Sequence, residues 1–502
     1  MRVLLLFLTL GGSLWTSAPG ASRPNILLVY TDDQGYGDVS CLNPAAKFKT
    51  PHQDRLAREG ITFTDAHCSD TVCTPSRYGL LTGRYSWRTT LKRGVYGAER
   101  PCLIADGRTT LASFLRTNGY HTAMVGKWHL GMDFPGTIGK RDWRKPVRDM
   151  PLDKGFDYFW GIPASMNYGV LAWFEGRFAK VPPTQWTKKK PNQIAISDYR
   201  IKPPYEKKQR PDLMEVAPDF VDSECLARFT DQAIKWIEGK SEDARQGKPF
   251  FLYLPFTSPH KPVIPNDQFR GRGEAGAYGE FMIETDWHLG RLLALLDREK
   301  LANNTIVIFT ADNGPETTWR QRIDKYGHHS PGPYREGKRS IYEGGHRVPF
   351  FLRWPARVKP GSSWDKPICQ TDLLATFAAI LGKPLPERSG EDSISFHWAW
   401  SGTGMTRPPR PPVIHHAANG RFAIRSEHWK LVMESTSRRE KRELYNLRAD
   451  PGERHNVLAR HPDVERKLFA QLIDIVTSGS TRPAVESTND TPPWEGLVWL
   501  PK

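Results

Sequence analysis

Short apolar stretches that run into polar side chains are the feature of this sequence that most constrains its fold. Four to eight apolar residues bounded by polar ones are typical of a buried strand. Three such strands, each with the polar residues that follow it, are Ile26–Tyr30 with Asp32 and Asp33, Phe250–Phe256 with His260, and the apolar part of NTIVIFTADNG with Asp312 and Asn313.

Helical patterns alternate with these strands. A helix is predicted from about Thr110 to Arg116, followed by a turn at Asn118 and Gly119 and a strand that runs into Gly126. The segment FMIETDWHLGRLLALLDREKL has helical spacing and leads into the strand of NTIVIFTADNG. This alternation predicts an α/β fold with a large, mostly parallel sheet sandwiched by helices. Such sheets bind ligands outside the carboxyl ends of their strands, where the polar residues above are expected.

Length and local composition divide the chain. At 502 residues it exceeds what one hydrophobic core usually supports, so two domains are expected. Residues 23–400 hold the strand-and-helix pattern, and residues 134–219 within them, rich in Pro, Lys and Trp, are interpreted as inserted loops. Short alternating strands predict a smaller domain with an antiparallel sheet over residues 401–502, and the proline-rich Thr406–Val413 marks the junction.

Residues 1–22 have the parts of a secretory signal peptide. Arg2 supplies the positive start, an apolar stretch begins with Val3–Leu10, and small residues run from Ser17 to Ser22. Cleavage is expected between Ala18 and Ser22. The apolar run is too short for a membrane anchor, and no cysteine follows it for a lipid anchor. We therefore expect an exported protein (periplasmic, secreted or in a lysosomal-type lumen) with no integral membrane segment.

The charge of the chain indicates the chemistry of its partner. A formal net charge of +16 favours polyanions such as nucleic acid, anionic lipid or acidic glycans. The sequence contains no helix-turn-helix, zinc-finger or RNP-like motif, so nucleic acid is not expected as a partner. A basic but inert surface is the simpler alternative.

Cys73, in VCTPSRYGLLTG, allows three interpretations. It could be a buried structural residue, half of a disulfide formed after export, or a reactive thiol activated by Arg77. Six cysteines are too few for a disulfide scaffold in a chain of this length. Because no C-x-x-C pair exists, structural zinc is not expected.

Two groups of side chains are expected to meet at the strand ends. One is an all-oxygen set that suits hard cations such as Ca²⁺ or Mg²⁺, although each acid alone could be an ordinary loop residue or helix cap. The other suggests an anion site with proton transfer, although a lone histidine is more often structural. The first group is Asp32, Asp33, Asp312 and Asn313, and the second is Lys127, His129, His260 and Lys338.

These motifs resemble those of the formylglycine-dependent sulfatases, the arylsulfatase type of the alkaline phosphatase superfamily. CTPSRYGLLTG is similar to the C-x-P-x-R maturation motif, and GYHTAMVGKWH to the second signature of the family. NILLVYTDDQGYGD and FTADNG match its metal-binding segments, and GKRSIYEGGHRVPFFLRWP matches a late core segment. The likeness runs from about Pro24 to Glu453, and it implies an alkaline-phosphatase-like fold.

The resemblance also implies a chemistry. A formylglycine-generating maturation enzyme would oxidise Cys73, and one hydroxyl of the hydrated aldehyde would attack sulfur. Loss of the proton from the other hydroxyl would then expel sulfate, a step that serine cannot perform. Ca²⁺ would polarise the sulfate, and its implied ligands are Asp32, Asp33, Asp312, Asn313 and the modified Cys73.

The family likeness assigns a role to each remaining residue. Asp312 would also take the proton of the nucleophile, Arg77 and Lys127 would stabilise the diol, and His129 would drive the elimination. Lys338 and His260 would bind the sulfate near the leaving oxygen, with His260 as the preferred general acid. Ser165, in GIPASMN, would contact the sulfate.

The expected function is hydrolysis of sulfate monoesters on a sulfated sugar of a polysaccharide or glycosaminoglycan. The export signal, the excess of basic residues and the Trp- and Lys-rich loops favour a glycan. Sugar rings could stack on Trp143, Trp160, Trp173 and Trp186, although core packing accounts better for an average Trp. One alternative is a phosphonate monoester or phosphodiester hydrolase with the same nucleophile. Another is a non-catalytic glycan-binding protein, which the complete set of expected catalytic residues disfavours.

Overall fold

The computed structural model describes residues 23–188, 201–401, 410–436, 439–483, 485–492 and 497–500. The expected signal peptide and the first half of Thr406–Val413 lie outside the described residues. Among the described residues, no helix combines the length and the apolar character that crossing a membrane requires.

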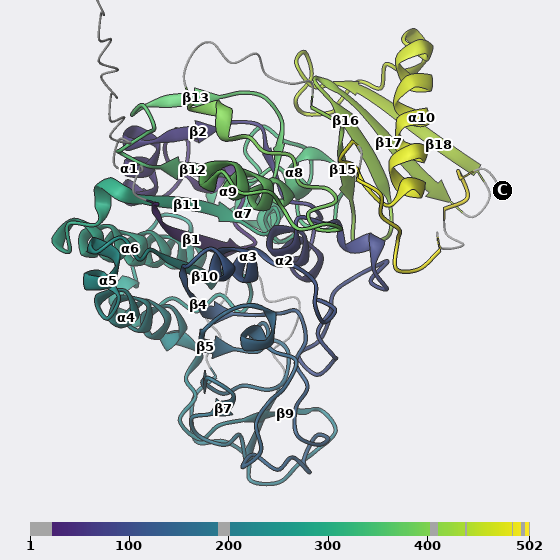
Figure 1. Cartoon of the computed structure of the whole chain (residues 1–502). Coiled ribbons are helices and arrows are strands. Elements are labelled where there is room, and N and C mark those ends of the chain that lie inside the picture. The colour runs from purple at the N-terminus through teal and green to yellow at the C-terminus, as the bar shows by residue number, and fades with distance from the viewer. Residues whose placement is uncertain are drawn as a thin grey trace, which may run out of the picture.

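A sheet of ten strands forms the centre of the molecule (Figure 1). Its five middle strands run parallel to one another, whereas antiparallel pairs occur toward both edges. The predicted, mostly parallel sheet is therefore confirmed. In spatial order the strands are β13 (Ser362–Trp364), β2 (Ile61–Phe63), β12 (Phe350–Arg353), β11 (Thr305–Ala311), β1 (Asn25–Asp32), β10 (Phe250–Pro259), β4 (His121–Lys127), β5 (Tyr158–Ile162), β6 (Phe174–Glu175) and β7 (Phe178–Ala179).

Strand β1 lies at the middle of the sheet, and its neighbours fix its register. Leu27 pairs with Leu252 of β10 on one side and with Val307 of β11 on the other. All residues of β1, β10 and β11 are buried, because helices cover both faces of the sheet. Strands buried on both faces are continuously apolar, which is why these three could be predicted from the sequence.

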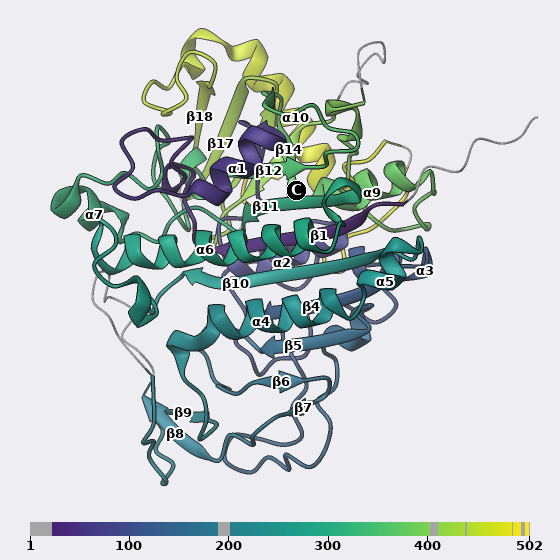
Figure 2. The ribbon, with the colours of Figure 1, turned by 90° about the vertical axis from the view of Figure 1, so that its left-hand side faces the viewer.

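Helices form a layer on each side of the sheet. Figure 2 shows α1, α4 and α6 over one face, where they contact β12 and β10, and α2 contacts α3 and α9 on the other side. The helices are α1 (Pro51–Glu59), α2 (Cys73–Thr82), α3 (Leu111–Thr117), α4 (Cys225–Glu238), α5 (Ser241–Arg245), α6 (Gly276–Arg298), α7 (Trp319–Tyr326), α8 (Glu343–His346) and α9 (Leu373–Leu381).

The helix predicted from about Thr110 is α3, and its start has a local cause. Thr110 Oγ1 accepts a hydrogen bond from the Ser113 backbone N–H at 3.0 Å, and Ser113 Oγ lies 2.9 Å from the Thr110 backbone N–H, which donates to it. This reciprocal capping satisfies two donors that the first turn leaves free. The predicted helix thus begins one residue late, with Thr110 as its cap.

The interpretation of residues 134–219 as inserted loops is wrong in part. Strand β5 pairs in parallel with β4, and β6 and β7 continue the same sheet as its edge, while β8 (Gln185–Lys188) and β9 (Leu213–Val216) form a separate pair. These strands are short and interrupted by Pro and Gly, so their period is weak in the sequence.

The tryptophans of this segment belong to the interior. Trp160, Trp173 and Trp186 are buried, and Trp143 is partly buried against the same core. The rings of Trp160 and Trp173 stack on each other with centroids 5.4 Å apart. Core packing, the interpretation preferred for an average Trp, therefore accounts for the three buried rings, and their buried surface leaves no face for a sugar.

A second sheet lies to one side of the first, near the C-terminus (Figure 1). Its antiparallel strands are β15 (Val413–His416), β16 (Phe422–Ser426), β17 (Trp429–Thr436) and β18 (Arg439–Asn446), and α10 (Pro462–Ser478) packs on β16 and β17. The predicted antiparallel sheet is confirmed. Two short strands, β3 (Ala66–His67) and β14 (Ile368–Cys369), pair separately.

Candidate active site

Acidic and amide side chains from two neighbouring strands meet at the carboxyl edge of the central sheet. Asp32 ends β1 and Asp33 follows it, while Asp312 and Asn313 follow the parallel β11. The Asp33 backbone N–H donates to Asp312 Oδ1 at 3.1 Å, and Asn313 Nδ2 donates to Asp33 Oδ1 at 2.7 Å. All four side chains are buried, so the predicted oxygen-rich cluster comes together.

Cys73 approaches this cluster from α2, of which it is the first residue. Its Sγ lies 3.5 Å from Asp32 Oδ1 and 3.6 Å from Lys338 Nζ. Burial raises the pKa of the thiol to about 12, although Lys127 and Lys338 oppose this shift. A thiol with this pKa is protonated at neutral pH and reacts poorly, which disfavours the reactive-thiol interpretation. All six cysteines are unpaired, which disfavours the disulfide interpretation.

Three buried basic side chains face the acids. Lys127, the last residue of β4, forms an ion pair with Asp32, and Lys338 forms one with Asp33. Arg77 lies one turn after Cys73 in α2 and donates through Nη2 to Asp312 Oδ2 at 2.7 Å. Acids and bases thus alternate around the thiol. A buried set of this kind is stable only when each charge has a partner.

The two strand-end acids respond differently to this setting. Burial opposes the charge of Asp32, but Lys127 above all, followed by His260 and Arg77, holds its pKa well below the usual range. Burial and the neighbouring Asp32 raise the pKa of Asp312 to about 7, although Arg77 opposes them. Two adjacent carboxyl groups in a buried site are expected to separate their pKa values in this way.

His260 directly follows β10, and two neighbours contact its Nδ1. Its Nδ1 lies 3.0 Å from Ser165 Oγ and contacts the Lys261 carbonyl, while its Nε2 lies 3.8 Å from Asp33 Oδ2. Burial lowers the pKa of His260 to about 4, with Asp32 opposing the shift and Lys338 adding to it. Ser165 therefore contacts His260, and the sequence analysis expects both residues to bind the sulfate.

His129 lies two residues beyond Lys127, with a backbone φ of 60°. Its Nε2 lies 3.0 Å from the Tyr96 carbonyl, which can only accept, so the proton is on Nε2. Its Nδ1 is buried and has no hydrogen-bond partner among the described residues. Burial, then Lys127 and Arg77, hold the pKa of His129 well below its usual range. A neutral ring with a free Nδ1 lone pair can accept a proton.

Two buried oxygens without hydrogen-bond partners in the described part of the chain show whether a hard cation fits the site around Cys73. Asp33 Oδ2 and Asn313 Oδ1 are buried without a hydrogen-bond partner among the described residues. Ligand atoms of Asp32, Asp33, Cys73 and His260 all lie within 4.8 Å of one another. Carboxylate and amide oxygens that lack partners are the donors that Ca²⁺ and Mg²⁺ prefer, so the residues fit such an ion.

The structure brings every predicted site residue into one connected site. They are Asp32, Asp33, Cys73, Arg77, Lys127, His129, Ser165, His260, Asp312, Asn313 and Lys338.

Sequence reasoning missed an outer group beside Lys338. Glu316 forms ion pairs with Arg339 and with Lys261, the latter at 3.2 Å between Lys261 Nζ and Glu316 Oε2. Tyr168 packs its ring 5.1 Å from that of His129. The sequence indicates this group only by proximity, since Arg339 directly follows Lys338 and Glu316 comes shortly after Asn313.

The fold and the site together are those of an α/β enzyme with buried bases and acids around a central thiol. The comparisons with known proteins agree. The sulfatase family model matches residues 24–383. An N-acetylgalactosamine-6-O-sulfatase of Bacteroides thetaiotaomicron is 33% identical over 496 residues, covering 91% of this chain and 94% of that protein. Human arylsulfatase A is 31% identical over 524 residues, covering 96% and 94%.

Among solved structures, one from Bacteroides thetaiotaomicron superimposes with a TM-score of 0.78 at 32% identity, covering 91% of this chain and 99% of the other. That structure is described as part of the metabolism of multiple glycosaminoglycans by this bacterium. The chain belongs to the sulfatase family, and it is a sulfuric ester hydrolase.

Proposed function

We propose that this sulfatase removes sulfate from sulfated sugars of an anionic polysaccharide or glycosaminoglycan. The observation that carries the proposal is the likeness, over nearly the whole chain, to an N-acetylgalactosamine-6-O-sulfatase. The buried bases Arg77, Lys127 and Lys338 around Cys73 supply the positive charge that a sulfate needs.

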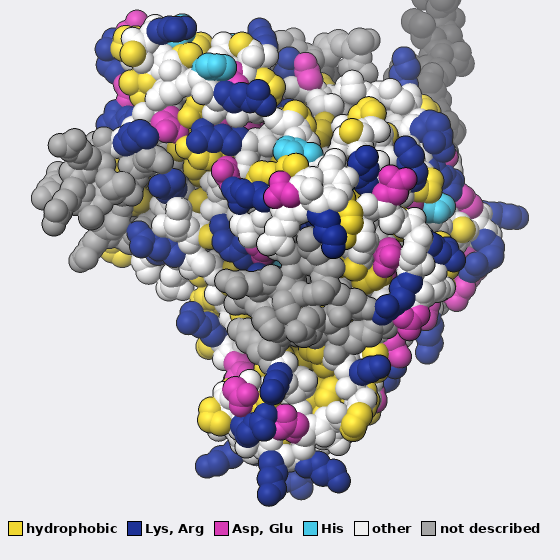
Figure 3. Space-filling model, turned by 180° about the vertical axis from the view of Figure 1, so that it is seen from behind, with side chains coloured by type: hydrophobic (Ala, Val, Ile, Leu, Met, Phe, Trp, Pro, Cys, Tyr) yellow, Lys and Arg dark blue, Asp and Glu magenta, His cyan; other side chains and the backbone are white. Residues whose placement is uncertain are grey.

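The surface supports an anionic polymer as the substrate. Figure 3 shows Lys and Arg side chains spread over the face drawn and gathered at the lower tip, in the part of the molecule that Figure 1 labels β7 and β9. Exposed bases of this part are Lys140, Arg144, Lys145, Lys180, Lys207, Lys208 and Arg210. A positive surface raises the local concentration of a polyanion and its rate of association.

The proposed nucleophile is Cys73 after conversion to formylglycine by a maturation enzyme. The protonated, buried thiol is a poor nucleophile, whereas a hydrated aldehyde at this position would offer two hydroxyl groups. The proposed acceptor of a proton from these hydroxyl groups is His129, whose Nδ1 has no hydrogen-bond partner among the described residues. Arg77 and Lys127 stabilise negative charge beside Cys73.

The proposed metal is Ca²⁺, held by Asp32, Asp33, Asp312, Asn313 and the converted Cys73. When bound, it would polarise the sulfate group and lower the pKa of the nucleophile. The chain itself contributes Lys338, whose ammonium contacts Asp33 and lies next to Cys73, as a second positive group for the sulfate oxygens.

The proposed general acid is His260. The ring is neutral near pH 7 because it is buried, but a bound sulfate ester brings negative charge that favours the imidazolium. Ser165 and the Lys261 carbonyl hold Nδ1, which leaves Nε2 on the side of Asp33. In this proposal Ser165 acts on the substrate through His260.

A screen of defined sulfated mono- and oligosaccharides, with sulfate release as the readout, tests the function. We expect turnover of a sulfated amino sugar, with the 6-sulfate of N-acetylgalactosamine as the first compound, and none by Cys73→Ala. Phosphonate monoesters and phosphodiesters form a parallel arm. Faster turnover of these esters than of any sulfate ester would overturn the proposal, as would binding of sulfated sugars without release of sulfate.

A further inference from the structure

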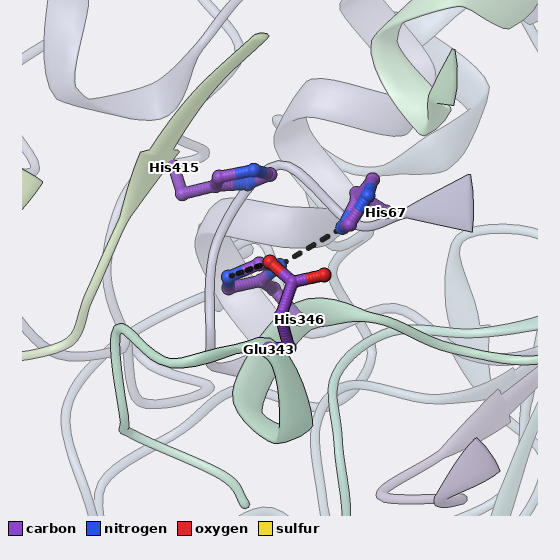
Figure 4. A group of neighbouring side chains, drawn as sticks. All are labelled: His67, Glu343, His346 and His415. Carbon is purple, nitrogen blue, oxygen red and sulfur yellow. Dashed lines mark hydrogen bonds and ion pairs between the residues drawn. The ribbon is translucent and has the colours of Figure 1, made fainter. Parts of the chain in front are cut away.

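A second buried cluster of potential ligands lies where three segments meet, apart from the residues around Cys73. His67 comes from β3, Glu343 and His346 from α8, and His415 from β15 (Figure 4). One nitrogen or carboxylate oxygen of each lies within 4.8 Å of the others, and all four side chains are 0% exposed. The proposed sulfatase mechanism uses none of them.

The protonation of His67 follows from its neighbour. His67 Nε2 lies 2.7 Å from Asp65 Oδ1, and Arg347 and Arg425 form ion pairs with the Asp65 carboxylate. An ionised carboxylate can only accept a hydrogen bond, so His67 Nε2 carries the proton. In the neutral ring, His67 Nδ1 then presents a lone pair.

His346 Nε2 has both a donor and an acceptor beside it. Lys430 Nζ donates hydrogen bonds to Ile341 O at 2.9 Å and to Glu343 Oε1 at 3.0 Å, and it lies 3.1 Å from His346 Nε2. An ammonium can only donate, so His346 Nε2 accepts and the proton of the neutral ring is on Nδ1. The Ile341 carbonyl, also 3.1 Å from His346 Nε2, can accept a proton from that nitrogen once Nδ1 has given up its own.

The proton on His346 Nδ1 lies between two nitrogens. His67 Nδ1 and His346 Nδ1 are 3.0 Å apart, so His346 Nδ1 donates a hydrogen bond to the lone pair of His67 Nδ1. A metal ion can take the place of this shared proton when His346 is protonated on Nε2 instead, because both Nδ1 atoms then present lone pairs to the ion. His415 adds an unsatisfied group: neither of its ring nitrogens has a hydrogen-bond partner among the described residues, and its ring stacks on that of His346 with centroids 3.8 Å apart.

We propose that His67, His346 and His415, together with Glu343, bind a transition-metal ion, for which Zn²⁺ is the best match. Tetrahedral zinc with Zn–N bonds of about 2.0–2.1 Å separates its ligand nitrogens by roughly 3.3 Å, close to the spacing of the two Nδ1 atoms. Metal-bound imidazoles typically donate their second N–H to a carboxylate or a backbone carbonyl, as His67 does to Asp65 and as His346 would to Ile341 with its Nδ1 on the ion. His415 would turn out of its stack to direct a nitrogen at the ion.

The charge around the cluster selects the kind of ion. Three carboxylates and three basic side chains surround it: Asp65, Glu343 and Glu453 against Lys430, Arg347 and Arg425. No excess of negative charge is available for a hard cation, so affinity rests on imidazole lone pairs, which suit zinc better than calcium. The absence of C-x-x-C pairs argues only against cysteine-based zinc, and apart from Glu343 and His346 these ligands are too far apart in the sequence to form a motif.

The ion would connect the C-terminal sheet to two segments that flank the residues around Cys73. β15 belongs to the former, while β3 leads toward Cys73 and α8 follows the loop that carries Lys338. The proposal is thus a structural site, and it does not depend on which sugar the enzyme desulfates.

Metal analysis of the full-length protein, made without a histidine tag in zinc-supplemented medium and dialysed against buffer with calcium, tests the proposal. We expect about one zinc per chain, lost in His415→Ala and retained in His288→Ala. His288 is the matched control, because it is fully buried and its ring nitrogens also lack hydrogen-bond partners among the described residues. Cys73→Ala should keep the zinc; loss of zinc in Cys73→Ala with retention in His415→Ala would overturn the proposal.

A second measurement uses the unmodified protein, in case His415→Ala fails to fold. X-ray absorption at the zinc edge should show nitrogen and oxygen neighbours with imidazole scattering, and zinc added to metal-free protein should raise its thermal midpoint. Sulfur neighbours, or a zinc-supplemented protein that contains no zinc and shows no rise in the midpoint, would overturn the proposal.

Discussion

At the scale of single residues, position matters more than residue type. Cys73 and Cys369 are both buried thiols whose pKa burial raises to about 12, yet only Cys73 has Asp32 and Lys338 beside its sulfur. His260 and His129 are both buried and neutral, but one is held through Nδ1 and the other through Nε2. These differences lead to three predictions.

The first prediction is that activity follows the converted fraction of Cys73. Serine at this position offers a single hydroxyl, so Cys73→Ser should stall after the first transfer and show no sustained turnover. Mass spectrometry of the peptide around Cys73, compared with turnover in preparations of differing conversion, checks this. Normal turnover by Cys73→Ser, or activity unrelated to the aldehyde fraction, would show the proposed nucleophile to be wrong.

The second prediction concerns the leaving group. A sugar alkoxide needs a proton as the S–O bond breaks, whereas nitrophenolate barely does, so His260→Ala should lower turnover of a sugar sulfate by about 10²- to 10⁴-fold and that of nitrophenyl sulfate far less. Ser165→Ala should show the same pattern at about two- to tenfold, the value of one lost hydrogen bond. Equal losses on both substrates in His260→Ala would contradict the role of general acid.

The third prediction concerns metal removal. Asp33 and Asn313 present unpaired oxygens, and Asp33→Asn reduces the charge that holds a hard cation. EGTA should abolish turnover, added Ca²⁺ should restore it, and Asp33→Asn should need more Ca²⁺ for half-maximal activity. Turnover that survives calcium removal would argue against the calcium site.

At the scale of elements, contacts between helices create properties, such as the pKa of Asp286, that the sequence of one segment does not predict. Asp286 of α6 accepts hydrogen bonds from the backbone N–H groups of His52 and Gln53, 3.1 Å and 2.8 Å away, at the start of α1. Burial raises the pKa of Asp286 to about 7, although both N–H groups favour its charged form. A helix start is thus capped by a residue from another helix.

The fourth prediction is a pH dependence of stability. Between pH 4 and 7 the unfolded chain releases the Asp286 proton while the folded protein keeps it, so this group lowers the free energy of unfolding as pH rises. Asp286→Asn removes this effect. The free energy of unfolding of the variant minus that of the parent should therefore increase from pH 4 to pH 7, by on the order of 4 kcal/mol for a shift of about three pKa units. Above pH 7 this difference should stay constant.

Urea unfolding of Asp286→Asn and the parent at pH 5 and pH 8 measures this difference. Asp297→Asn, which changes a partly exposed acid of the same helix, is the control and should leave the pH dependence unchanged. An identical pH dependence in Asp286→Asn and the parent would contradict the prediction.

Elements also show how far the sequence predicts the fold. β1, β10 and β11 are apolar throughout and were predictable, and the polar residues after them form the site. The strands of residues 134–219 were not, since two-residue strands such as β6 and β7 have no measurable period. The contact between Ser165 and His260 depends on where separate loops meet, which no local pattern specifies.

At the scale of the whole molecule, one buried lysine connects the C-terminal sheet to two acids outside that sheet. Lys430 of β17 is 0% exposed and pairs with Glu343 of α8 and with Glu453. Neither acid is near Lys430 in the sequence, so these ion pairs also lay beyond sequence analysis. Because removing one partner leaves buried charges without compensation, such pairs are costly to break.

The fifth prediction follows from this contact. Lys430→Met should lower the free energy of unfolding by about 3–5 kcal/mol. Lys441→Met, which changes a largely exposed lysine of the same sheet, should change it by less than about 1 kcal/mol. Urea unfolding of the two variants and the parent provides the comparison, and equal stabilities of the two variants would contradict the prediction.

The burial of α2 has a consequence for the order of events in the cell. All ten of its residues, Cys73–Thr82, are buried, so the folded protein offers an enzyme no access to Cys73. If Cys73 is converted as proposed, a maturation enzyme would have to meet this segment while the chain is still extended, before folding buries it. Maturation and folding would then compete in time, and the rate of synthesis relative to the supply of maturation enzyme would set how many finished molecules are active.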